Sequence, residues 1–184
     1  MMAKVLSILG SPRSTSNSTF LTDAFLEEYR NLRPDDLIVS KKLQGMRIQA
    51  CTGCEMCKRI GNGCVLKDDM NVLYPLVRGA DIILYASPVY WWGISGQLKI
   101  FMDRLHALDH AVFAGKRIVV IVTGSDESSG IQYQLIQRQF QEICDYLSMD
   151  LAGYLPISAD DEHPAATNLL ALQAARDLAK SILA

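Results

Sequence analysis

Apolar residues occur along this chain in two alternating patterns. Five short runs rich in Val, Ile and Leu predict strands that are buried on both faces. Between these runs, apolar residues recur three or four positions apart and predict helices with one apolar side each. The predicted strands cover residues 5–9, 37–39, 81–86, 117–122 and 151–157. The helical apolar positions are Leu21, Phe25, Tyr29 and Leu32; Met70, Leu73, Tyr74 and Val77; Leu98, Phe101, Met102 and Leu105; Ile136, Phe140, Ile143 and Leu147; and Ala171, Ala174, Ala175, Leu178 and Ile182.

This alternation predicts an α/β fold of three layers, in which helices cover both faces of a five-stranded parallel sheet. No internal repeat, low-complexity segment or linker interrupts the pattern, so we expect one domain over residues 1–184. Its irregular part is a cysteine-rich insertion at about residues 44–67. Asp68 and Asp69 precede the next helix and are expected to cap its N-terminus, while Pro75 weakens the expectation of an unbroken helix.

A polar loop follows the first strand. Residues 10–19 contain several hydroxyl side chains, one glycine, one proline and one arginine before the helical pattern resumes at Phe20. N–H groups at a helix start have no partner within the helix and favour an anion, and Ser, Thr and Arg side chains add donors for a phosphate. The loop lacks the Gly-Lys-Ser/Thr ending of a Walker A loop and the spaced glycines of a Rossmann fingerprint. It also fits a simpler role, in which its hydroxyls only cap the helix.

Two further loops stand out, after the third and fourth predicted strands. Residues 87–96 carry Tyr90, Trp91 and Trp92 in succession, and residues 123–127 begin with Thr-Gly. Exposed aromatic side chains at the end of a strand suit a flat, partly apolar ring. Because ligands of parallel sheets bind at the carboxyl ends of the strands, we expect both loops and residues 10–19 to form one site. The two tryptophans equally suit a subunit interface, and the two roles are compatible.

The composition narrows the function further. The 184-residue chain is 49% apolar and has a formal net charge of −2, which argues against nucleic acid as a partner. It has no apolar run near the ~18 residues of a membrane span and no signal-peptide pattern, so we expect a cytoplasmic protein without a membrane partner. Four of its five cysteines lie in one short segment, unlike the dispersed cysteines of secreted disulfide frameworks.

The clustered cysteines are Cys51, Cys54, Cys57 and Cys64. Thiolates at such close spacing are able to hold a [4Fe–4S] cluster or a tetrahedral zinc ion. Free or redox-active thiols are a third interpretation, and the spacing leaves all three open. Cys144, by contrast, falls on an apolar helix face and is expected in the core.

Structural roles are expected for the other polar residues. His106, His110 and His163 are interpreted as surface or capping residues, since no Ser-His-Asp or metal-histidine spacing is present. Asp103 and Arg104 are interpreted as a structural or subunit-contact pair. We therefore identify no catalytic acid or base.

Three motifs together resemble the NADPH-dependent FMN reductase family, in the flavodoxin-like branch that includes the iron–sulfur flavoproteins. They are Gly-Ser-Pro-Arg at residues 10–13, the cysteine segment ending in Asp-Asp-Met at 68–70, and Ser-Pro-Val-Tyr-Trp-Trp-Gly at 87–93, which continues to Asp-Arg at 103–104. The resemblance spans nearly the whole chain and implies strand order 2-1-3-4-5 and bound FMN. For the four cysteines it favours an iron–sulfur cluster over zinc, but many similar relatives carry such cysteines with flavin only, so free or redox-active thiols stay open. It implies phosphate contacts from Ser11, Arg13, Ser16, Asn17, Ser18 and Thr19, ring contacts from Pro88, Val89, Tyr90, Trp91, Trp92 and Gly93, and a third side formed by Thr123, Gly124 and Ser125.

On this basis we expect a homodimeric or homotetrameric FMN-dependent NAD(P)H oxidoreductase. Its flavin would carry the chemistry, accepting hydride from NAD(P)H and passing electrons to a quinone, a flavin, or another small-molecule or protein acceptor. The first alternative is an iron–sulfur flavoprotein that relays single electrons through a [4Fe–4S] cluster on the four cysteines. The second alternative is a non-catalytic flavodoxin-like binding or regulatory protein.

Overall fold

A parallel sheet in the order β2–β1–β3–β5–β6 forms the centre of the computed structural model, which describes residues 2–61 and 63–183. The register places Leu6 of the interior strand β1 beside Val39 of β2 on one side and Ile83 of β3 on the other. Leaving aside one short hairpin strand, this confirms the predicted order 2-1-3-4-5. The parallel strands are β1 (Lys4–Leu9), β2 (Leu37–Lys42), β3 (Ile82–Tyr90), β5 (Arg117–Gly124) and β6 (Asp150–Ser158).

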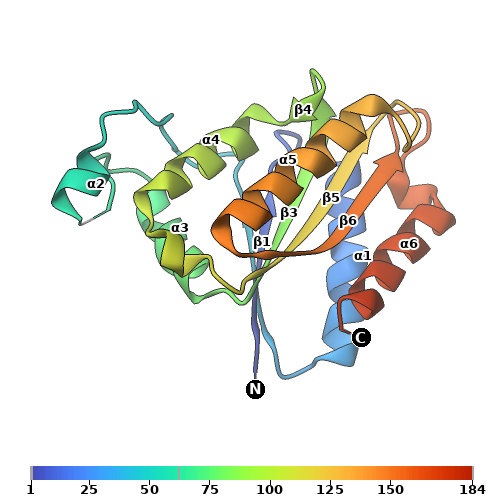
Figure 1. Cartoon of the computed structure of the whole chain (residues 1–184). Coiled ribbons are helices and arrows are strands. Elements are labelled where there is room, and N and C mark those ends of the chain that lie inside the picture. The colour runs from blue at the N-terminus through green and yellow to red at the C-terminus, as the bar shows by residue number, and fades with distance from the viewer. Residues whose placement is uncertain (1, 62, 184) are drawn as a thin grey trace.

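Helices cover both faces of the sheet (Figure 1). One face is packed by α1 (Asn17–Leu32) and α6 (Leu169–Ser181), the other by α3 (Met70–Gly79), α4 (Gly96–Arg104) and α5 (Ile131–Leu147). The short helix α2 (Met56–Ile60) lies in the cysteine segment, which projects from the sheet beside α3 and α4. None of the described helices is both long and apolar enough to cross a membrane.

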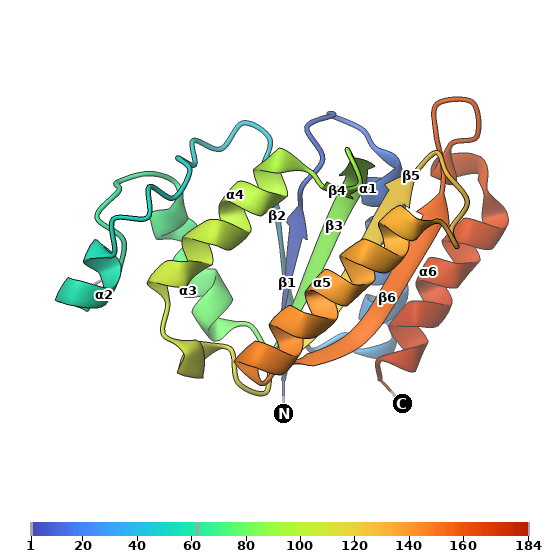
Figure 2. The ribbon, with the colours of Figure 1, turned by 45° about the horizontal axis from the view of Figure 1, so that its top comes forward.

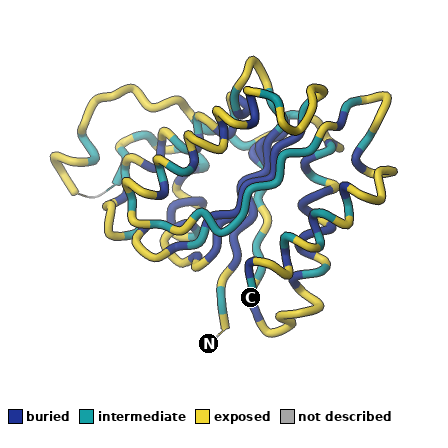
Figure 3. Tube along the Cα trace, turned by 45° about the vertical axis from the view of Figure 1, so that its right-hand side comes forward, coloured by how far each residue is buried: buried dark blue, intermediate teal, exposed yellow. Residues whose placement is uncertain are grey.

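Two apolar cores result from the alternation of side chains along the central strands. Figure 3 shows these strands as buried segments in the middle of the molecule. On β3, Ile83 points into the core under α3, α4 and α5, whereas Leu84 points into the core under α1 and α6. Both side chains are fully buried. Burial of apolar surface on both faces supplies the main driving force for this arrangement.

The structure differs from the predicted elements near the end of β3. This strand continues to Tyr90, because Ser87 and Pro88 still pair with Val122 and Thr123 of β5. A two-residue strand, β4 (Gly93–Ile94), then folds back antiparallel onto Val89 and Tyr90. Residues 87–96, expected as a loop, therefore contain a tight hairpin.

Smaller corrections concern helix ends. Helix α3 is continuous through Pro75, which lies on its exposed side. Asp69 occupies the N-cap position but its side chain forms no capping bond, whereas Asp68 Oδ1 accepts the Met70 N–H at 3.0 Å. Leu32, expected on the apolar face of α1, is the last residue of that helix and is 45% exposed.

Candidate functional site

A cleft of about 200 Å³ opens at the carboxyl ends of β1, β3 and β5. Figure 2 shows the loops that follow β1, β5 and β6 at this one edge of the sheet. The three loops selected from the sequence, which follow β1, β3 and β5, all contribute lining residues to this cleft, as the general rule for parallel sheets predicts. The cleft is lined by Ser11, Arg13, Ser16, Asn17, Pro88, Val89, Tyr90, Thr123, Gly124, Ser125, Ala159, Asp160 and Asp161.

The hydroxyl loop serves both as a helix cap and as a wall of the cleft. Ser16 is the N-cap of α1, and its Oγ accepts the Thr19 N–H at 3.3 Å. Ser18 and Thr19 turn their hydroxyls toward Ser16 Oγ, at 3.3 and 2.8 Å, and do not line the cleft. Ser11, only 1% exposed, contributes a hydroxyl to the cleft wall. The structure thus places the predicted phosphate residues in two groups, one at the cleft and one within the first turn of α1.

Arg13 is the cationic side chain at the mouth of the cleft. Its Nη1 lies 2.5 Å from Asp161 Oδ1, and this hydrogen bond raises the pKa of Arg13. Tyr90, on the facing wall, adds to the same shift. Asn17 faces the segment after β6, where its Nδ2 donates to the Asp160 carbonyl and its Oδ1 accepts the Ala165 N–H. An anion bound at this mouth would compete with Asp161 for the guanidinium.

Sequence reasoning missed the segment at residues 159–161. It follows the last strand of the sheet and so lies at the same carboxyl edge as the other loops. The hydrogen bond from the His163 N–H holds the pKa of Asp160 below its usual range. The rule that selected the loops after the other strands would have selected this one also, had it been applied to every strand.

Two glycines allow the walls of the cleft to pack closely. A Cβ on Gly10 would lie 2.8 Å from Leu98 Cβ, so a side chain there would push α4 away from β1. A Cβ on Gly124 would lie 3.1 Å from Val89 Cβ. The end of β5 therefore packs directly on β3, and the cleft stays narrow between these strands.

The β3–β4 hairpin turn carries the tryptophan pair. Trp91 and Trp92 have φ values of 48° and 61°, so both central residues of a two-residue turn are left-handed. Their rings meet edge to face at 5.8 Å, and 92% of Trp91 and 58% of Trp92 are exposed. Neither ring lines the cleft in this structure, and Gly93 does not either. We call Trp91 and Trp92 the hairpin tip.

The chemistry of the cleft fits FMN. A buried hydroxyl at Ser11, the Arg13 guanidinium and the N–H groups at the start of α1 are donors that suit a phosphate. Pro88 and Val89 offer an apolar wall and Tyr90 an aromatic ring, which suit a planar heterocycle. A side chain at Gly124 would occupy the space beside Val89, so the glycine leaves that space open for a ligand.

A second, smaller hollow lies in the cysteine segment. Cys51, Cys54, Cys57 and Cys64 all line it, with Arg104 and His106. The Met56 N–H and the Thr52 hydroxyl hydrogen-bond to Cys54 and lower its pKa. In the described ranges 2–61 and 63–183, no three His, Cys, Asp or Glu side chains are grouped closely enough to hold a metal ion. The thiols suit a soft metal by their chemistry, and the cluster stays a prediction.

Arg104 and Asp68 anchor this segment to the body of the protein. Both side chains are buried, and Arg104 Nη1 donates to Asp68 Oδ2 at 2.5 Å and to the Gln49 carbonyl at 2.8 Å. Asp68 Oδ2 also accepts the Gln49 N–H. Arg104 is structural as expected, but Asp103 pairs with Lys99 at 2.6 Å and does not join it.

The remaining polar residues have the structural roles expected of them. Cys144 is fully buried, and burial raises its pKa to about 11. His106 lies 3.3 Å from Glu55 at the surface, and His163 lies 3.3 Å from Asp160. His110 packs edge to face on Tyr146.

The family model for NADPH-dependent FMN reductases matches residues 3–161. An iron–sulfur flavoprotein of Archaeoglobus fulgidus is 32% identical over 158 residues, which cover 84% of this chain and 75% of that protein. A second iron–sulfur flavoprotein of the same organism is 38% identical over 109 residues, and this chain spans about half of it, 47%. The chain therefore belongs to the NADPH-dependent FMN reductase family.

A solved structure shows the same fold. The NAD(P)H:quinone oxidoreductase from Methanothermobacter marburgensis superposes with a TM-score of 0.73 over 100% of this chain and 98% of its own. The two sequences are 15% identical, so this likeness concerns the fold alone.

Proposed function

We propose that this member of the NADPH-dependent FMN reductase family holds FMN in the cleft and passes electrons from NAD(P)H to an acceptor. Family membership supports an FMN-dependent NAD(P)H oxidoreductase. The observation that carries the proposal is the convergence of the loops after β1, β3 and β5 on one cleft. A quinone, a flavin or another small-molecule or protein acceptor would receive the electrons.

Each wall of the cleft has its own task in this proposal. Ser11, Arg13 and the N-terminus of α1 bind the phosphate. Pro88, Val89 and Tyr90 flank the ring, and residues 123–125 close the third side. When bound, FMN supplies hydride acceptance from the reduced nicotinamide and electron transfer to the acceptor. The protein supplies binding, orientation and exclusion of water, and no side chain of the cleft is proposed as a catalytic acid or base.

The test is titration of flavin-free protein with FMN, followed by NAD(P)H oxidation in the presence of a quinone. Arg13→Ala should weaken FMN binding about tenfold, because a charge-assisted hydrogen bond to the phosphate is lost. Arg30→Ala, at the far end of the same helix, is the matched control and should bind FMN normally. Failure of the wild-type protein to bind FMN would overturn the proposal.

A second candidate function is that of an iron–sulfur electron carrier. The observation that favours it is that all four clustered cysteines line one hollow, and the names of the iron–sulfur flavoprotein relatives are consistent with it. Protein purified without oxygen should then contain about four iron and four sulfide per chain. Cys54→Ser should remove the iron and leave FMN bound, while Cys144→Ser, a cysteine outside the hollow, should keep both. Flavin without iron in the wild-type protein would exclude this candidate.

The proposal also covers the cellular location and the oligomeric state of the protein. All five cysteines are free thiols, which suits a reducing compartment, and we place the protein in the cytoplasm. The exposed hairpin tip next to the cleft suits a homo-oligomer, either a dimer or a tetramer.

A further inference from the structure

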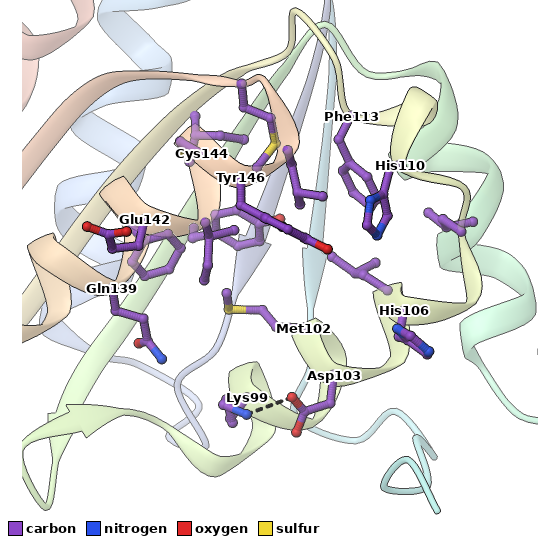
Figure 4. Close-up of a pocket in the computed structure, with 18 residues that line it drawn as sticks. Lys99, Met102, Asp103, His106, His110, Phe113, Gln139, Glu142, Cys144 and Tyr146 are labelled. Atoms are coloured by element: carbon purple, nitrogen blue, oxygen red, sulfur yellow. Dashed lines mark hydrogen bonds and ion pairs between the residues drawn. The ribbon is translucent and has the colours of Figure 1, made fainter. Parts of the chain in front are cut away.

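The hollow formed by the four clustered cysteines, which we call the cysteine hollow, is also lined by charged side chains. One of them is His106, which is paired with Glu55 at 3.3 Å. Another is Asp103, whose carboxylate accepts a hydrogen bond from Lys99 at 2.6 Å, drawn as the dashed line in Figure 4. Both side chains therefore already have partners other than the cysteines.

Arg104 also lines the cysteine hollow, and it keeps an unused donor. Its Nη1 and Nη2 donate to the Asp68 carboxylate at 2.5 and 3.2 Å, and Nη1 also donates to the Gln49 carbonyl at 2.8 Å. The third nitrogen, Nε, is buried and has no hydrogen-bond partner among the described residues. The side chain as a whole is only 1% exposed. Because a buried N–H without an acceptor destabilises a fold, this one indicates an acceptor at the hollow that Arg104 lines.

A cysteine sulfur is the acceptor that the hollow offers. Arginine stays protonated, so Nε–H is a permanent donor, whereas a neutral thiol is only a weak acceptor. A metal-bound thiolate carries negative charge and accepts a stronger, charge-assisted bond. Burial alone would lower the pKa of Arg104, but the hydrogen bond to Asp68 and nearby charges, that of Cys64 among them, raise it. Cys64 also packs against the core under α3, α4 and α5, so it is the cysteine on the Arg104 side of the hollow.

The cysteine hollow suits an iron–sulfur cluster better than a single metal ion. Within residues 2–61 and 63–183, no three His, Cys, Asp or Glu side chains lie close enough together to hold one ion. Each cysteine of a [4Fe–4S] cluster binds a different iron, so the four sulfurs lie farther apart than those of a zinc site. The Met56 N–H and the Thr52 hydroxyl hydrogen-bond to Cys54. Together with Arg104 Nε, they provide donors for the negative charge of such a group.

We propose that Arg104 donates its Nε–H to the Cys64 sulfur when the four cysteines hold a [4Fe–4S] cluster, and that this bond fixes the ligand and raises the reduction potential of the cluster. A reduced cluster carries one more negative charge, so a hydrogen bond to its ligand sulfur stabilises the reduced form more than the oxidised form. The guanidinium then has two tasks, because its Nη groups bind Asp68 and Gln49 while Nε acts on the cysteines. The inference rests on the second candidate function, the iron–sulfur electron carrier, and names a positioning residue for it.

The first test is the reduction potential of the cluster, followed by low-temperature EPR in FMN-loaded protein purified without oxygen. Arg104→Lys keeps a cation for Asp68 but removes Nε, and it should shift the equilibrium constant for one-electron reduction about tenfold toward the oxidised form, or about 59 mV. Arg59→Lys is the matched control, because Arg59 is exposed and does not line the hollow, and it should leave the potential unchanged. Asp68→Asn removes the charged partner of the Nη groups and keeps Nε, so it should destabilise the fold without lowering the potential.

The outcomes separate this inference from the function on which it rests. Wild-type protein without iron would overturn the electron carrier and the inference with it. A wild-type cluster whose potential is unchanged in Arg104→Lys would overturn the inference alone. An equal fall in Arg104→Lys and Asp68→Asn would also overturn it, because the effect would then come from the anchor and not from Nε.

A second test leaves Arg104 in place and so does not depend on the folding of its variants. It uses Arg59→Lys protein whose remaining arginines carry ¹⁵N at Nε, so that the arginine nearest in sequence to a clustered cysteine contributes no signal. Pulsed EPR of the reduced cluster should detect a ¹⁵N nucleus coupled to it. A cluster without this coupling would overturn the assignment of Arg104 Nε as the donor.

Discussion

At the scale of single residues, the mouth of the cleft contains an ion pair between Arg13 and Asp161 that the sequence does not reveal. Arg13 and Asp161 are 148 positions apart and meet at 2.5 Å across the mouth of the cleft. Both side chains are largely exposed, so water and salt screen their attraction. The Asp161 carboxylate hydrogen-bonds to the guanidinium that would otherwise bind a phosphate, and its negative charge would repel that phosphate.

Asp161→Asn should therefore tighten FMN binding. The substitution removes a competing anion and frees Arg13, and we expect an affinity about two- to fivefold higher at low ionic strength, the size of a typical exposed ion pair. The gain should fade as salt is added. Fluorescence titration with FMN at several salt concentrations measures both effects. Riboflavin, which has no phosphate, is the control ligand and should bind both proteins equally; an equal gain for riboflavin would contradict the electrostatic explanation.

Two buried serines differ in whether their hydroxyls form hydrogen bonds. Ser7 in β1 and Ser95 at the start of α4 are both fully buried. Ser95 Oγ donates to the Gly10 carbonyl at 2.6 Å and accepts the Leu98 N–H, whereas Ser7 Oγ has no hydrogen-bond partner among the described residues. A buried hydroxyl with partners stabilises the fold, and one without partners destabilises it.

Ser7→Ala should accordingly raise the free energy of unfolding by about 1 kcal/mol, while Ser95→Ala should lower it by about 1–2 kcal/mol. Urea unfolding followed by circular dichroism measures both variants. If Ser7→Ala destabilises the protein as much as Ser95→Ala does, the Ser7 hydroxyl has an acceptor in solution.

At the scale of elements, the long periodic segments were predictable and the short ones were not. The strands around Leu6, Ile83 and Val120 read as continuous apolar runs because both of their faces are buried, and their existence and order are confirmed. The two-residue strand β4 leaves no such pattern. Its turn also lacks the Asn-Gly signal of a type I′ hairpin, because Trp91 and Trp92 occupy the left-handed positions.

The candidate site was likewise predictable only in part. The sequence selects the hydroxyl loop, yet whether Ser16 or Ser18 faces the cleft depends on where α1 begins. Helix starts are uncertain by several residues in any sequence-based prediction. Whether Tyr90, Trp91 or Trp92 faces a ligand depends similarly on the β3–β4 turn, which the pattern of apolar residues does not predict. Convergence of the loops could be predicted, but the direction of individual side chains could not.

The hairpin turn should store strain. Bulky residues at positive φ cost about 1–3 kcal/mol each, whereas Asn and Gly adopt these angles readily. The double substitution Trp91→Asn/Trp92→Gly should therefore raise stability by about 1 kcal/mol or more, or about 2–4 °C in Tm for a chain of this size. Thermal unfolding of the variant and of the wild type at the same low protein concentration measures the difference. A lower Tm for the variant would show that the packed tryptophan rings stabilise the protein more than their backbone angles destabilise it.

At the scale of the whole molecule, the cysteine segment depends on one buried ion pair. Arg104 of α4 binds Asp68 and Gln49, which lie at the two ends of the segment. The segment between them contributes few side chains to either core and lies at the periphery of the molecule (Figure 3). The pair is thus what holds the two ends of the segment in place while leaving the thiols in its middle accessible.

Asp68→Asn should release this anchor, and the effect should depend on pH. Burial alone would raise the pKa of Asp68, but hydrogen bonds from Arg104 and from the Gln49 and Met70 N–H groups hold it below its usual range. A carboxyl with a lowered pKa stabilises the fold above its unfolded value of about 4, and this contribution is lost as the pH falls through the lower folded value. The variant should lose about 3 kcal/mol near pH 7, since removing one partner leaves Arg104 buried without its counter-charge.

The difference in unfolding free energy between wild type and Asp68→Asn should shrink below about pH 4, because the wild-type carboxyl is then protonated in the unfolded state and, on further acidification, in the folded state. Urea unfolding across pH 3–7 measures it, with the exposed Asp35→Asn as control. Limited proteolysis should also cut the variant faster between residues 43 and 67, because that segment loses both of its fixed ends. A pH-independent difference would mean that Asp68 stabilises the fold through its shape and neutral hydrogen bonds, and not through its charge.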